Sequence, residues 1–258
     1  MKPVPHKRRI WVTGATSGIG QALALKLAAN GHSVIASGRN ADALEELAGV
    51  RGITAKAVDV SNAESLKNAQ KAIAQQFGAL DTVVVNAGVC EYLQNLPADM
   101  EMWERIYSTN LKGAIATIDC ALPLLAASEF RGQVVGVVSQ VIFAPFSQAE
   151  FYGASKAALD YYLKSLAIDL KQKQIDVARI YPGFVKTPLT DKNHFDMPFI
   201  VSAEDAANTM THAIEDRKTE CIFPKRLYYV LKTSQWFPSF WTRKFSQQSR
   251  VALALSDA

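Results

Sequence analysis

The feature that most constrains the fold is a repeated alternation of short β-rich runs with amphipathic stretches. Two of the runs, residues 83–88 and 134–138, are almost uniformly apolar. Parallel strands have this composition because helices bury both faces of their sheet. Strand–helix alternation repeated this often predicts an α/β fold with one doubly wound parallel sheet and helices on both faces. No linker or low-complexity segment divides the chain, so we expect a single domain.

The expected elements follow from periodicity and from turn residues. Ser61 with Glu64 has the capping-box pattern of a helix start, and Ser202 with Asp205 marks the start of the last helix. Strands are predicted over residues 8–14, 32–38, 52–60, 80–88, 132–139, 175–183 and 219–223. Helices are predicted over residues 18–31, 41–49, 61–78, 100–127 and 151–173, and from Ser202 onward.

The composition of the chain indicates which kinds of ligand it binds and in which compartment it is expected. The chain has 258 residues, of which 49% are apolar, and a formal net charge of +4, so a globular protein without a nucleic-acid partner is expected. The three cysteines are scattered and lack metal-ligand spacing, which predicts no metal and a reducing compartment. The apolar stretch behind the basic N-terminus covers only Ile10 to Val12, and no run approaches the roughly 18 apolar residues of a membrane span. We expect a cytoplasmic protein.

The sequence TGATSGIG, residues 13–20, lies between the first predicted strand and the first predicted helix. Gly14, Gly18 and Gly20 permit a tight turn and let main-chain N–H groups approach a pyrophosphate at the helix N-terminus. The spacing differs from the general G-x-G-x-x-G fingerprint. Ligands of open α/β sheets bind beyond the carboxyl ends of the strands, where this turn is expected. The position favours dinucleotide binding of the Rossmann type over a purely structural turn.

The residues that end the second strand bear on the choice of nicotinamide cofactor. An NAD site usually offers a carboxylate to the ribose 2′-hydroxyl there, but this chain has Ser37, Gly38, Arg39 and Asn40. A guanidinium can bind a 2′-phosphate through paired hydrogen bonds. The alternative is that Arg39 is an ordinary surface arginine. The missing acid favours NADP(H) over NAD(H).

Tyr152 and Lys156 are four residues apart in the helix predicted over residues 151–173, so they share one helix face. Tyrosine has a reference pKa of about 10, which is a poor match to neutral pH. A positive charge a few ångström away favours the phenolate and lowers that pKa. The pair therefore predicts a tuned proton donor or acceptor, although an isolated Y-x-x-x-K pair is usually a solvated helix face.

With these motifs in order, the chain resembles the short-chain dehydrogenase/reductase family over about residues 8–223. TGATSGIG matches the family's TGxxxGIG, and residues 152–156 match its YxxxK. The other matches are Asp59 in VDV, the NAG element at residues 86–88 after Val85, Asn110 in STNLKG, Ser139 ahead of Tyr152, and PGFVKT at residues 182–187. The resemblance implies an oxidoreductase that interconverts a carbonyl and a secondary alcohol.

The resemblance also implies roles for single residues. Four are expected to be catalytic: Asn110 supports a proton relay through water, Ser139 hydrogen-bonds the substrate oxygen, Tyr152 transfers a proton, and Lys156 also holds the nicotinamide ribose. The cofactor is expected to supply the hydride. The expected cofactor-binding residues are Gly14, Thr16, Ser17, Gly18, Ile19, Gly20, Arg39, Asn40, Asp59, Val60, Asn86, Ala87, Gly88, Tyr152, Lys156, Pro182, Gly183, Val185 and Thr187.

Two features depart from the family pattern. Gln140 follows Ser139 where a second serine or a small residue is common, and this is expected to alter the pocket beside the serine. The C-terminal DGG of many tetrameric relatives is absent. Because related enzymes commonly pair through two long helices, here residues 100–127 and 151–173, we expect a homodimer.

The substrate contacts expected are Ser139, Val141, Phe146 and Tyr152. The other side chains expected near the nicotinamide are mostly apolar, among them Cys90, Tyr92, Leu93, Ile142, Phe143, Leu189, Phe195, Met197 and Phe199. This lining offers no obvious clamp for an acidic substrate, so a hydrophobic, lipid-like substrate is favoured. A dehydrogenase of small polar hydroxy acids and a cofactor-sensing binding protein without turnover remain alternatives. The presence of all four expected catalytic residues argues against a binding protein without turnover.

An unusual tail, residues 224–258, follows the predicted catalytic domain of residues 1–223. Its aromatic residues recur at helical spacing, with basic residues between them. Such segments suit a membrane interface, which would make the protein peripheral at a membrane surface. The alternative is that the tail packs on its own domain or on a second subunit.

Overall fold

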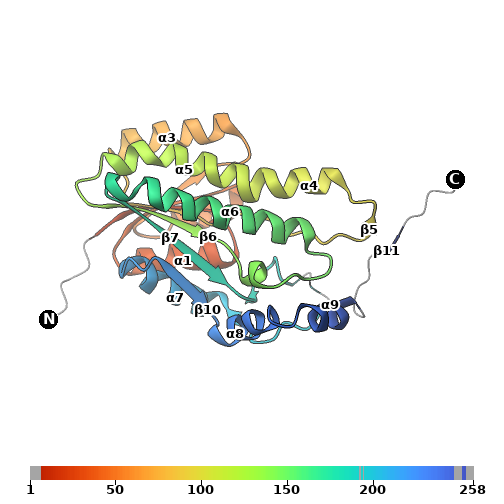
Figure 1. Ribbon diagram of the computed structural model, residues 1–258. Helices are drawn as coiled ribbons and strands as arrows, with labels where there is room; N and C mark the ends of the chain where they lie inside the picture. Colours follow the sequence, from red (N-terminus) through yellow and green to blue (C-terminus); the bar gives the residue numbers. More distant parts are fainter. Residues whose placement is uncertain (1–6, 192, 194, 247–251, 254–258) are drawn as a thin grey trace.

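The computed structural model describes residues 7–191, 193, 195–246 and 252–253 (Figure 1). Parts of the predicted tail, residues 247–251 and 254–258, lie outside the described residues, as do residues 1–6, 192 and 194. The described part forms a central parallel sheet between two layers of helices. The fold predicted from the strand–helix alternation is therefore confirmed.

Seven parallel strands form the main sheet, in the order β10-β7-β6-β4-β1-β2-β3. They are β1 (Arg9–Thr13), β2 (Ser33–Gly38), β3 (Ile53–Ala57), β4 (Thr82–Val85), β6 (Gly132–Val137), β7 (Ile175–Pro182) and β10 (Glu220–Phe223). The chain leaves β1 toward β2 and β3, then crosses back to β4 on the other side of β1. The strand order therefore reverses between β1 and β4, and the loops that follow these two strands run in opposite directions. In such sheets ligands bind in the crevice between these loops.

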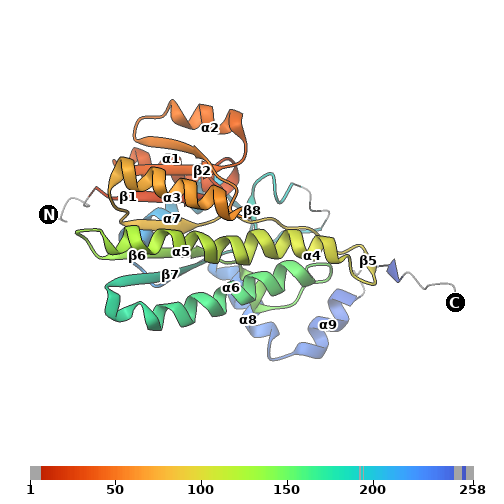
Figure 2. The same ribbon diagram turned by 90° about the horizontal axis from the view of Figure 1, so that it is seen from above.

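Helices cover both faces of the sheet (Figures 1 and 2). One layer contains α3 (Ala63–Phe77), α5 (Gly113–Ala126) and α6 (Glu150–Asp169), and the other contains α1 (Gly18–Ala29), α2 (Ala41–Ala48) and α7 (Ala203–Glu215). Successive side chains of a strand point to opposite faces. In β1, Trp11 accordingly packs into the α3–α5–α6 core, and Ile10 and Val12 pack into the α1–α7 core.

One predicted helix start is wrong and one is confirmed. Ser61 does not cap α3, because its hydroxyl donates to the Asp59 carboxylate over 2.6 Å. Asn62 takes the cap instead, and its side-chain oxygen accepts from the Ser65 N–H at 2.9 Å. At α7 the Ser202 hydroxyl accepts from the Asp205 N–H at 3.0 Å, as predicted.

The helix predicted over residues 100–127 is interrupted. It consists of α4 (Met100–Tyr107), a π-helical turn (Ser108–Lys112) and α5. The π-helical turn contains Asn110, and such turns recur at functional sites because they reposition one side chain within a helix. The helix predicted to reach residue 173 ends at Asp169 and continues as a 3₁₀ turn, Lys171–Lys173.

Short strand pairs and the tail complete the described chain. β5 (Asn95–Leu96) pairs with β11 (Ala252–Leu253), and β8 (Val185–Lys186) pairs with β9 (Val201–Ser202). The tail forms α8 (Lys225–Ser234) and α9 (Pro238–Ser246), which follow β10 directly. Leu227, Leu231 and Trp241 are buried together with Ala144 in a small separate core. This part of the tail packs on its own domain, and no helix among the described residues is long and apolar enough to cross a bilayer.

Candidate active site

We call residues 13–20, which join the end of β1 to the start of α1, the glycine turn. A cleft of about 360 Å³ lies at the carboxyl ends of the strands. The glycine turn, the ends of β4 and β6 and the N-terminal part of α6 surround it. All the residues expected to bind the cofactor line this cleft, and so does Ser139. Asn110, Val141 and Phe146 are not among the described residues that line it. The fold has brought together side chains from both halves of the sheet.

The glycine turn is shaped by close approach to the loop after β4. Gly14 has a φ of 64°, a conformation that favours glycine. A Cβ atom on Gly14 would lie 2.7 Å from the Ala87 Cα, and one on Gly20 would collide with the Gly14 carbonyl. A Cβ on Gly88 would lie 3.2 Å from the Asn110 side-chain oxygen and 3.4 Å from the Lys156 Nζ. Only a hydrogen atom fits at Gly14 and Gly20, and the contact at Gly88 is tight, so these residues contribute main chain to the lining of the cleft.

The N-terminus of α1 opens onto this part of the cleft. Its N-cap residue, Ser17, makes no side-chain capping bond, and the first turn contains no acidic residue. The first N–H groups of a helix lack intrahelical partners and carry the positive end of the helix dipole. A phosphate is the kind of ligand that such a terminus binds.

The opposite end of the cleft contains Arg39, Asn40 and Asp59. The Asn40 side-chain oxygen accepts from the Ala43 N–H at 3.1 Å and so caps α2. Hydrogen bonds from Ser61 lower the pKa of Asp59, and the nearby positive charge of Arg39 lowers it further. Arg39 itself is exposed. The guanidinium is therefore close enough to act on this end of the cleft and is open to a ligand.

Asn86 stabilises the glycine turn through hydrogen bonds. Its side-chain amide donates to the carbonyl oxygens of Thr13 and Gly14 at 3.0 and 3.1 Å, and its own N–H donates to the Thr13 hydroxyl at 3.1 Å. The side chain of Asn86 thus fixes the loop after β4 against the loop after β1.

Tyr152 and Lys156 occupy successive turns of α6 beside the cleft, as their spacing predicts. Lys156 is 4% exposed, and its ammonium donates to the Val137 carbonyl oxygen at 2.9 Å. Burial disfavours the charged form and lowers the pKa of Lys156 to about 8. This lysine therefore loses its charge only slightly above neutral pH.

The predicted lowering of the Tyr152 pKa by Lys156 is wrong in this structure. Burial raises the pKa of Tyr152 above its ordinary value, and the nearby Cys90 raises it further. A hydrogen bond with Ser139 opposes this rise but is the smaller effect. The loss of water on burial is the largest effect, and Lys156 is not among the groups that shift this pKa. The Tyr152 phenol is consequently held in its protonated form.

Ser139 and Tyr152 both line the cleft, and the serine hydroxyl is close enough to lower the pKa of the phenol. Ser139 follows β6 and begins a short 3₁₀ turn, in which its hydroxyl accepts from the Val141 N–H at 3.2 Å. Gln140 is 1% exposed and turns away from the cleft. Its side-chain amide donates to the carbonyl oxygens of Tyr181 and Pro224 at 3.3 and 3.2 Å. The residue that departs from the family pattern thus anchors the serine turn to β7 and to the start of the tail.

Asn110 is fully buried behind the cleft. Its side-chain oxygen accepts from the Val89 N–H at 2.8 Å, and its amide donates to the Val89 carbonyl at 2.9 Å and to the Ser155 hydroxyl at 3.1 Å. These bonds join the loop after β4 to α6, one residue before Lys156. The part played by Asn110 in a proton relay stays a prediction.

Aromatic side chains gather near the catalytic end. Tyr92 lies near Cys90 and Tyr152, because both act on its pKa. The Tyr92 and Phe195 ring centroids are 5.8 Å apart, edge-on, and those of Phe195 and Phe184 are 6.0 Å apart. Phe195, from the segment between β8 and β9, therefore lies near this end of the cleft, although none of the three rings is among the described lining residues. The three cysteines are free thiols.

Val141 and Phe146, the two predicted substrate residues that do not line the cleft, pack against other parts of the chain. Val141 packs 3.8 Å from the position that a Cβ on Gly153 would occupy, next to Tyr152. Phe146 packs edge-on against Trp241 and Phe245 of α9. Its ring contributes to the core that joins the tail to the domain, so a direct substrate contact stays a prediction.

Sequence reasoning missed some lining residues, namely Val58, Val89, Thr109, Val137, Val138, Pro188 and Thr190. Most are direct neighbours of residues that were predicted. Thr190 is different, because its hydroxyl accepts from the Thr187 N–H at 3.0 Å and donates to the Val185 carbonyl at 2.7 Å, closing the turn after β8. The spacing of Thr187 and Thr190 is the signal of such a hydroxyl-stabilised turn.

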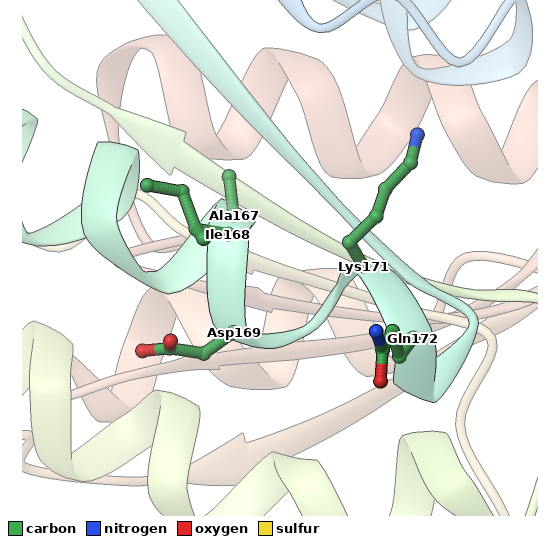
Figure 3. Close-up of a pocket in the computed structure, with 5 residues that line it drawn as sticks. All are labelled: Ala167, Ile168, Asp169, Lys171 and Gln172. Atoms are coloured by element: carbon green, nitrogen blue, oxygen red, sulfur yellow. The ribbon is translucent and has the colours of Figure 1, made fainter.

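A second hollow lies at the C-terminal end of α6 and is lined by Ala167, Ile168, Asp169, Lys171 and Gln172 (Figure 3). It is about 24 Å from Tyr152 along the helix, at 1.5 Å per residue. The Asp169 and Lys171 side chains point in different directions there, so no polar groups converge. Among the described residues no cluster of three or more His, Cys, Asp or Glu could hold a metal ion.

Comparison with known proteins agrees with this geometry. The family model described as short chain dehydrogenase matches residues 8–197. A relative from Myxococcus xanthus, named an uncharacterized oxidoreductase, is 38% identical over 90% of this chain and 93% of its own length. A relative from Salmonella typhi, named an NADP-dependent 3-hydroxy acid dehydrogenase, is 33% identical over 68% of this chain and 72% of its own length.

A solved structure shows the same fold. The short chain dehydrogenase/reductase from Burkholderia phymatum in complex with NAD superimposes with a TM-score of 0.81. The match covers 91% of this chain and 95% of that chain, at 19% sequence identity.

Proposed function

The chain belongs to the short-chain dehydrogenase family, and on that premise we propose that it is an NADP(H)-dependent oxidoreductase that interconverts a carbonyl and a secondary alcohol on a hydrophobic substrate. The observation that carries the proposal is the meeting of the Ser139 and Tyr152 hydroxyls beside Lys156, in a cleft whose other end is the glycine turn. The family establishes NAD(P)-dependent oxidoreduction; the cofactor preference, the substrate class and the residue roles are the proposed part.

The cleft fits a dinucleotide. Gly14 and Gly20 let the turn pack tightly against the loop after β4, and both residues line the cleft with main chain. The uncapped N-terminus of α1 suits a pyrophosphate. Arg39 and Asp59 would hold the adenosine end, and Lys156 with residues 182–187 would hold the nicotinamide end. When bound, the nicotinamide supplies or accepts the hydride.

Tyr152 would transfer the proton. Its raised pKa keeps the phenol protonated at neutral pH, which is the state that a proton donor to a carbonyl oxygen needs. Ser139, hydrogen-bonded to the same hydroxyl, would hold that oxygen in place. Lys156, whose ammonium is fixed by the Val137 carbonyl oxygen, would hold the nicotinamide ribose.

The preference for NADP(H) rests on Arg39. The guanidinium stands where an NAD-specific enzyme would offer a carboxylate, and it is open to a ligand. Paired hydrogen bonds from a guanidinium to a phosphate are strong and directional. The relative from Salmonella typhi, which is named NADP-dependent, supports the same preference.

The proposal of a hydrophobic substrate rests on the aromatic side chains near the catalytic end. Tyr92 interacts electrostatically with Tyr152, and its ring contacts Phe195, which contacts Phe184 in turn. Among the described lining residues the charged ones are Arg39, Asp59 and Lys156, of which the first two lie at the adenosine end. The described lining therefore offers no second cation to bind a substrate carboxylate.

A hydroxy-acid dehydrogenase is the second candidate, because the Salmonella typhi relative is named for a 3-hydroxy acid. A cofactor-binding protein without turnover is disfavoured, because Ser139, Tyr152 and Lys156 are all present and adjacent.

A screen of purified protein tests the proposal. Oxidation of NADPH would be followed with long-chain ketones, aldehydes and acyl lipids, and separately with small 3-oxo acids, each repeated with NADH. Turnover of the hydrophobic compounds with NADPH is expected. Faster turnover of the small oxo acids would favour the second candidate, and a faster reaction with NADH would overturn the cofactor assignment.

A further inference from the structure

Helices α8 and α9 and the link between them expose an unusual number of large apolar side chains. Five of them, from 49% to 77% exposed, are Tyr229, Val230, Trp236, Phe237 and Phe240. They fall within twelve consecutive residues, and we call them the tail face. Monomeric proteins rarely expose apolar groups this close together unless the surface has a partner.

The tail face is surrounded by positive charge. Residues 221–246 contain five basic residues and no Asp or Glu. All five are exposed, and none has a carboxylate partner within the described part of the chain: Lys225, Arg226, Lys232, Arg243 and Lys244.

The tail face is held on the domain by the inner sides of the same helices. Leu227, Leu231 and Trp241 are buried. The Trp241 indole N–H donates to the Pro145 carbonyl oxygen at 2.6 Å, and the Gln235 amide donates to the Phe143 carbonyl oxygen at 2.7 Å. Figures 1 and 2 both show α8 and α9 at the edge of the molecule, so their outer sides are accessible.

We infer that the tail face binds the surface of an anionic phospholipid bilayer. Trp, Tyr and Phe with Lys and Arg between them are the composition of helices that lie in the membrane interface. The aromatic rings enter the boundary between headgroups and acyl chains, and the basic side chains attract anionic headgroups. The helices need not refold to bind, because their apolar inner sides are already buried against the domain.

The charge of the face argues against a second copy of this chain as the occupant. A two-fold dimer contact brings the same surface patch of both subunits together. Here that contact would place two sets of five cations opposite one another, none of which has a carboxylate partner among the described residues. An anionic bilayer offers the complementary charge over an area large enough to cover both helices.

Binding would set the orientation of the cleft. The contacts that hold the tail are to Phe143 and Pro145, in the loop that follows Ser139. A bilayer at the tail face would therefore lie on the side of the cleft where the catalytic serine stands. That this arrangement admits a substrate from the membrane rests on the proposed function, but the binding itself does not.

The test is co-sedimentation of the full chain, without substrate or cofactor, with two kinds of vesicle. One is phosphatidylcholine mixed with phosphatidylglycerol, and the other is phosphatidylcholine alone. Binding to the mixed vesicles at low salt, loss of binding at high salt, and little binding to the neutral vesicles are expected. The variant R243Q/K244Q should bind roughly tenfold more weakly or worse, since each basic residue near an anionic surface contributes separately.

Matched variants separate the tail face from general surface effects. Trp236→Ser with Phe240→Ser should abolish binding, because the apolar contribution is lost while the charge is kept. Ile168→Ser removes an equally exposed apolar side chain, 77% exposed, at the far end of α6. Lys171→Gln with Lys173→Gln removes two exposed cations there. Both controls should bind as the unchanged chain does.

Tryptophan fluorescence gives a second measurement. Of the four tryptophans, Trp236 is 77% exposed, Trp11 and Trp241 are buried, and Trp103 is half-buried in α4 and stacked on Tyr107. Mixed vesicles with brominated acyl chains should quench Trp236 emission. Trp236→Phe should remove most of that quenching and leave sedimentation nearly unchanged.

The inference is overturned if the unchanged chain does not sediment with the mixed vesicles at low salt, or sediments equally with neutral ones. It is also overturned if the Trp236/Phe240 variant lowers the mass of the protein in light scattering, because the face would then be a contact between copies. A protein that binds vesicles but reduces no hydrophobic carbonyl would refute only the proposed function. One that reduces such compounds without binding vesicles would refute only this inference.

Discussion

Gln140 donates its side-chain amide to the main-chain carbonyl oxygen of Pro224 across 3.2 Å, and so joins the turn that begins at Ser139 to the first residue of the tail. The same amide donates to the Tyr181 carbonyl at 3.3 Å. The side chain is buried. The position of the proposed catalytic serine thus depends on a residue unusual for the family and on a segment outside the main sheet.

Gln140→Leu should therefore lower both stability and turnover. Two buried carbonyls would lose their donor, which costs about 1–3 kcal/mol of unfolding free energy. The turn would also loosen, so kcat should fall while the affinity for NADPH is kept. Thermal denaturation, steady-state kinetics and an NADPH titration measure these effects, with Gln172→Leu in the exposed 3₁₀ turn as the control. A loss of stability without a change in kcat would make Gln140 a purely structural residue.

Tyr152→Phe should abolish carbonyl reduction. Only the hydroxyl is removed, and a positioned proton donor contributes about 10²- to 10⁴-fold to the rate. NADPH binding should persist, because the ring keeps its place on α6. Stopped-flow oxidation of NADPH and a binding titration check both expectations. Tyr161→Phe, an exposed position on the same helix, should behave as the unchanged chain; ordinary activity in the Tyr152 variant would refute the mechanism.

Arg39→Ala should weaken NADPH binding and leave NADH binding almost unchanged. The expected loss is roughly ten- to a hundredfold, the range for a hydrogen bond to a charged group. Titrations of both cofactors measure the ratio, and Arg51→Ala removes an exposed arginine elsewhere as a control. An equal loss of affinity for the two cofactors would show that Arg39 does not bind the 2′-phosphate.

Lys156→Met should abolish activity and yet stabilise the fold at neutral pH. The Lys156 pKa is lowered from 10.5 to about 8 by burial, so below pH 8 the folded chain holds an unfavourable buried charge. A shift of this size corresponds to roughly 3 kcal/mol. Between about pH 8 and 10.5 the unfolded chain keeps a proton that the folded chain has lost, so the stability of the unchanged protein rises with pH in that window. The advantage of the variant should shrink there.

Denaturant unfolding at several pH values measures that difference directly. Lys171→Met, at an exposed position just after α6, is the control. A Lys156 variant that is less stable at pH 7 would show that the bond to Val137 outweighs the cost of burial.

A homodimer is expected to form through α5 and α6. Ile118, Leu159 and Leu163 are buried against the sheet, while Leu166 is half-buried and Tyr161 is 75% exposed. Light scattering should report a dimer rather than a tetramer. Tyr161→Asp with Leu166→Asp should give a monomer, because two carboxylates would enter an apolar contact. The Trp236→Ser/Phe240→Ser variant should remain dimeric. A dimer unaffected by the α6 substitutions would place the interface elsewhere.

Sequence periodicity and short motifs were sufficient to predict the fold and most of the residues that line the cleft. The strand–helix alternation predicts the parallel sheet, since each element carries its own periodicity. The glycines at residues 14, 18 and 20 and the pair Tyr152 and Lys156 are short-range motifs, so their places follow once the strands are assigned. The cofactor residues line a single cleft because the carboxyl ends of parallel strands meet at one edge.

What the sequence by itself determined is therefore the fold class, the family and the edge of the sheet where the chemistry lies. Only the tertiary structure decided the rest. The pKa of Tyr152 is raised because burial removes water from the phenol, and the number of surrounding atoms cannot be read from a four-residue spacing. The roles of Gln140 and the tail likewise depend on contacts between residues 84 or more positions apart in the chain. Burial and long-range contacts exist only after folding. They decide the pKa of a side chain such as Tyr152 and the hydrogen-bond partners of a side chain such as Gln140.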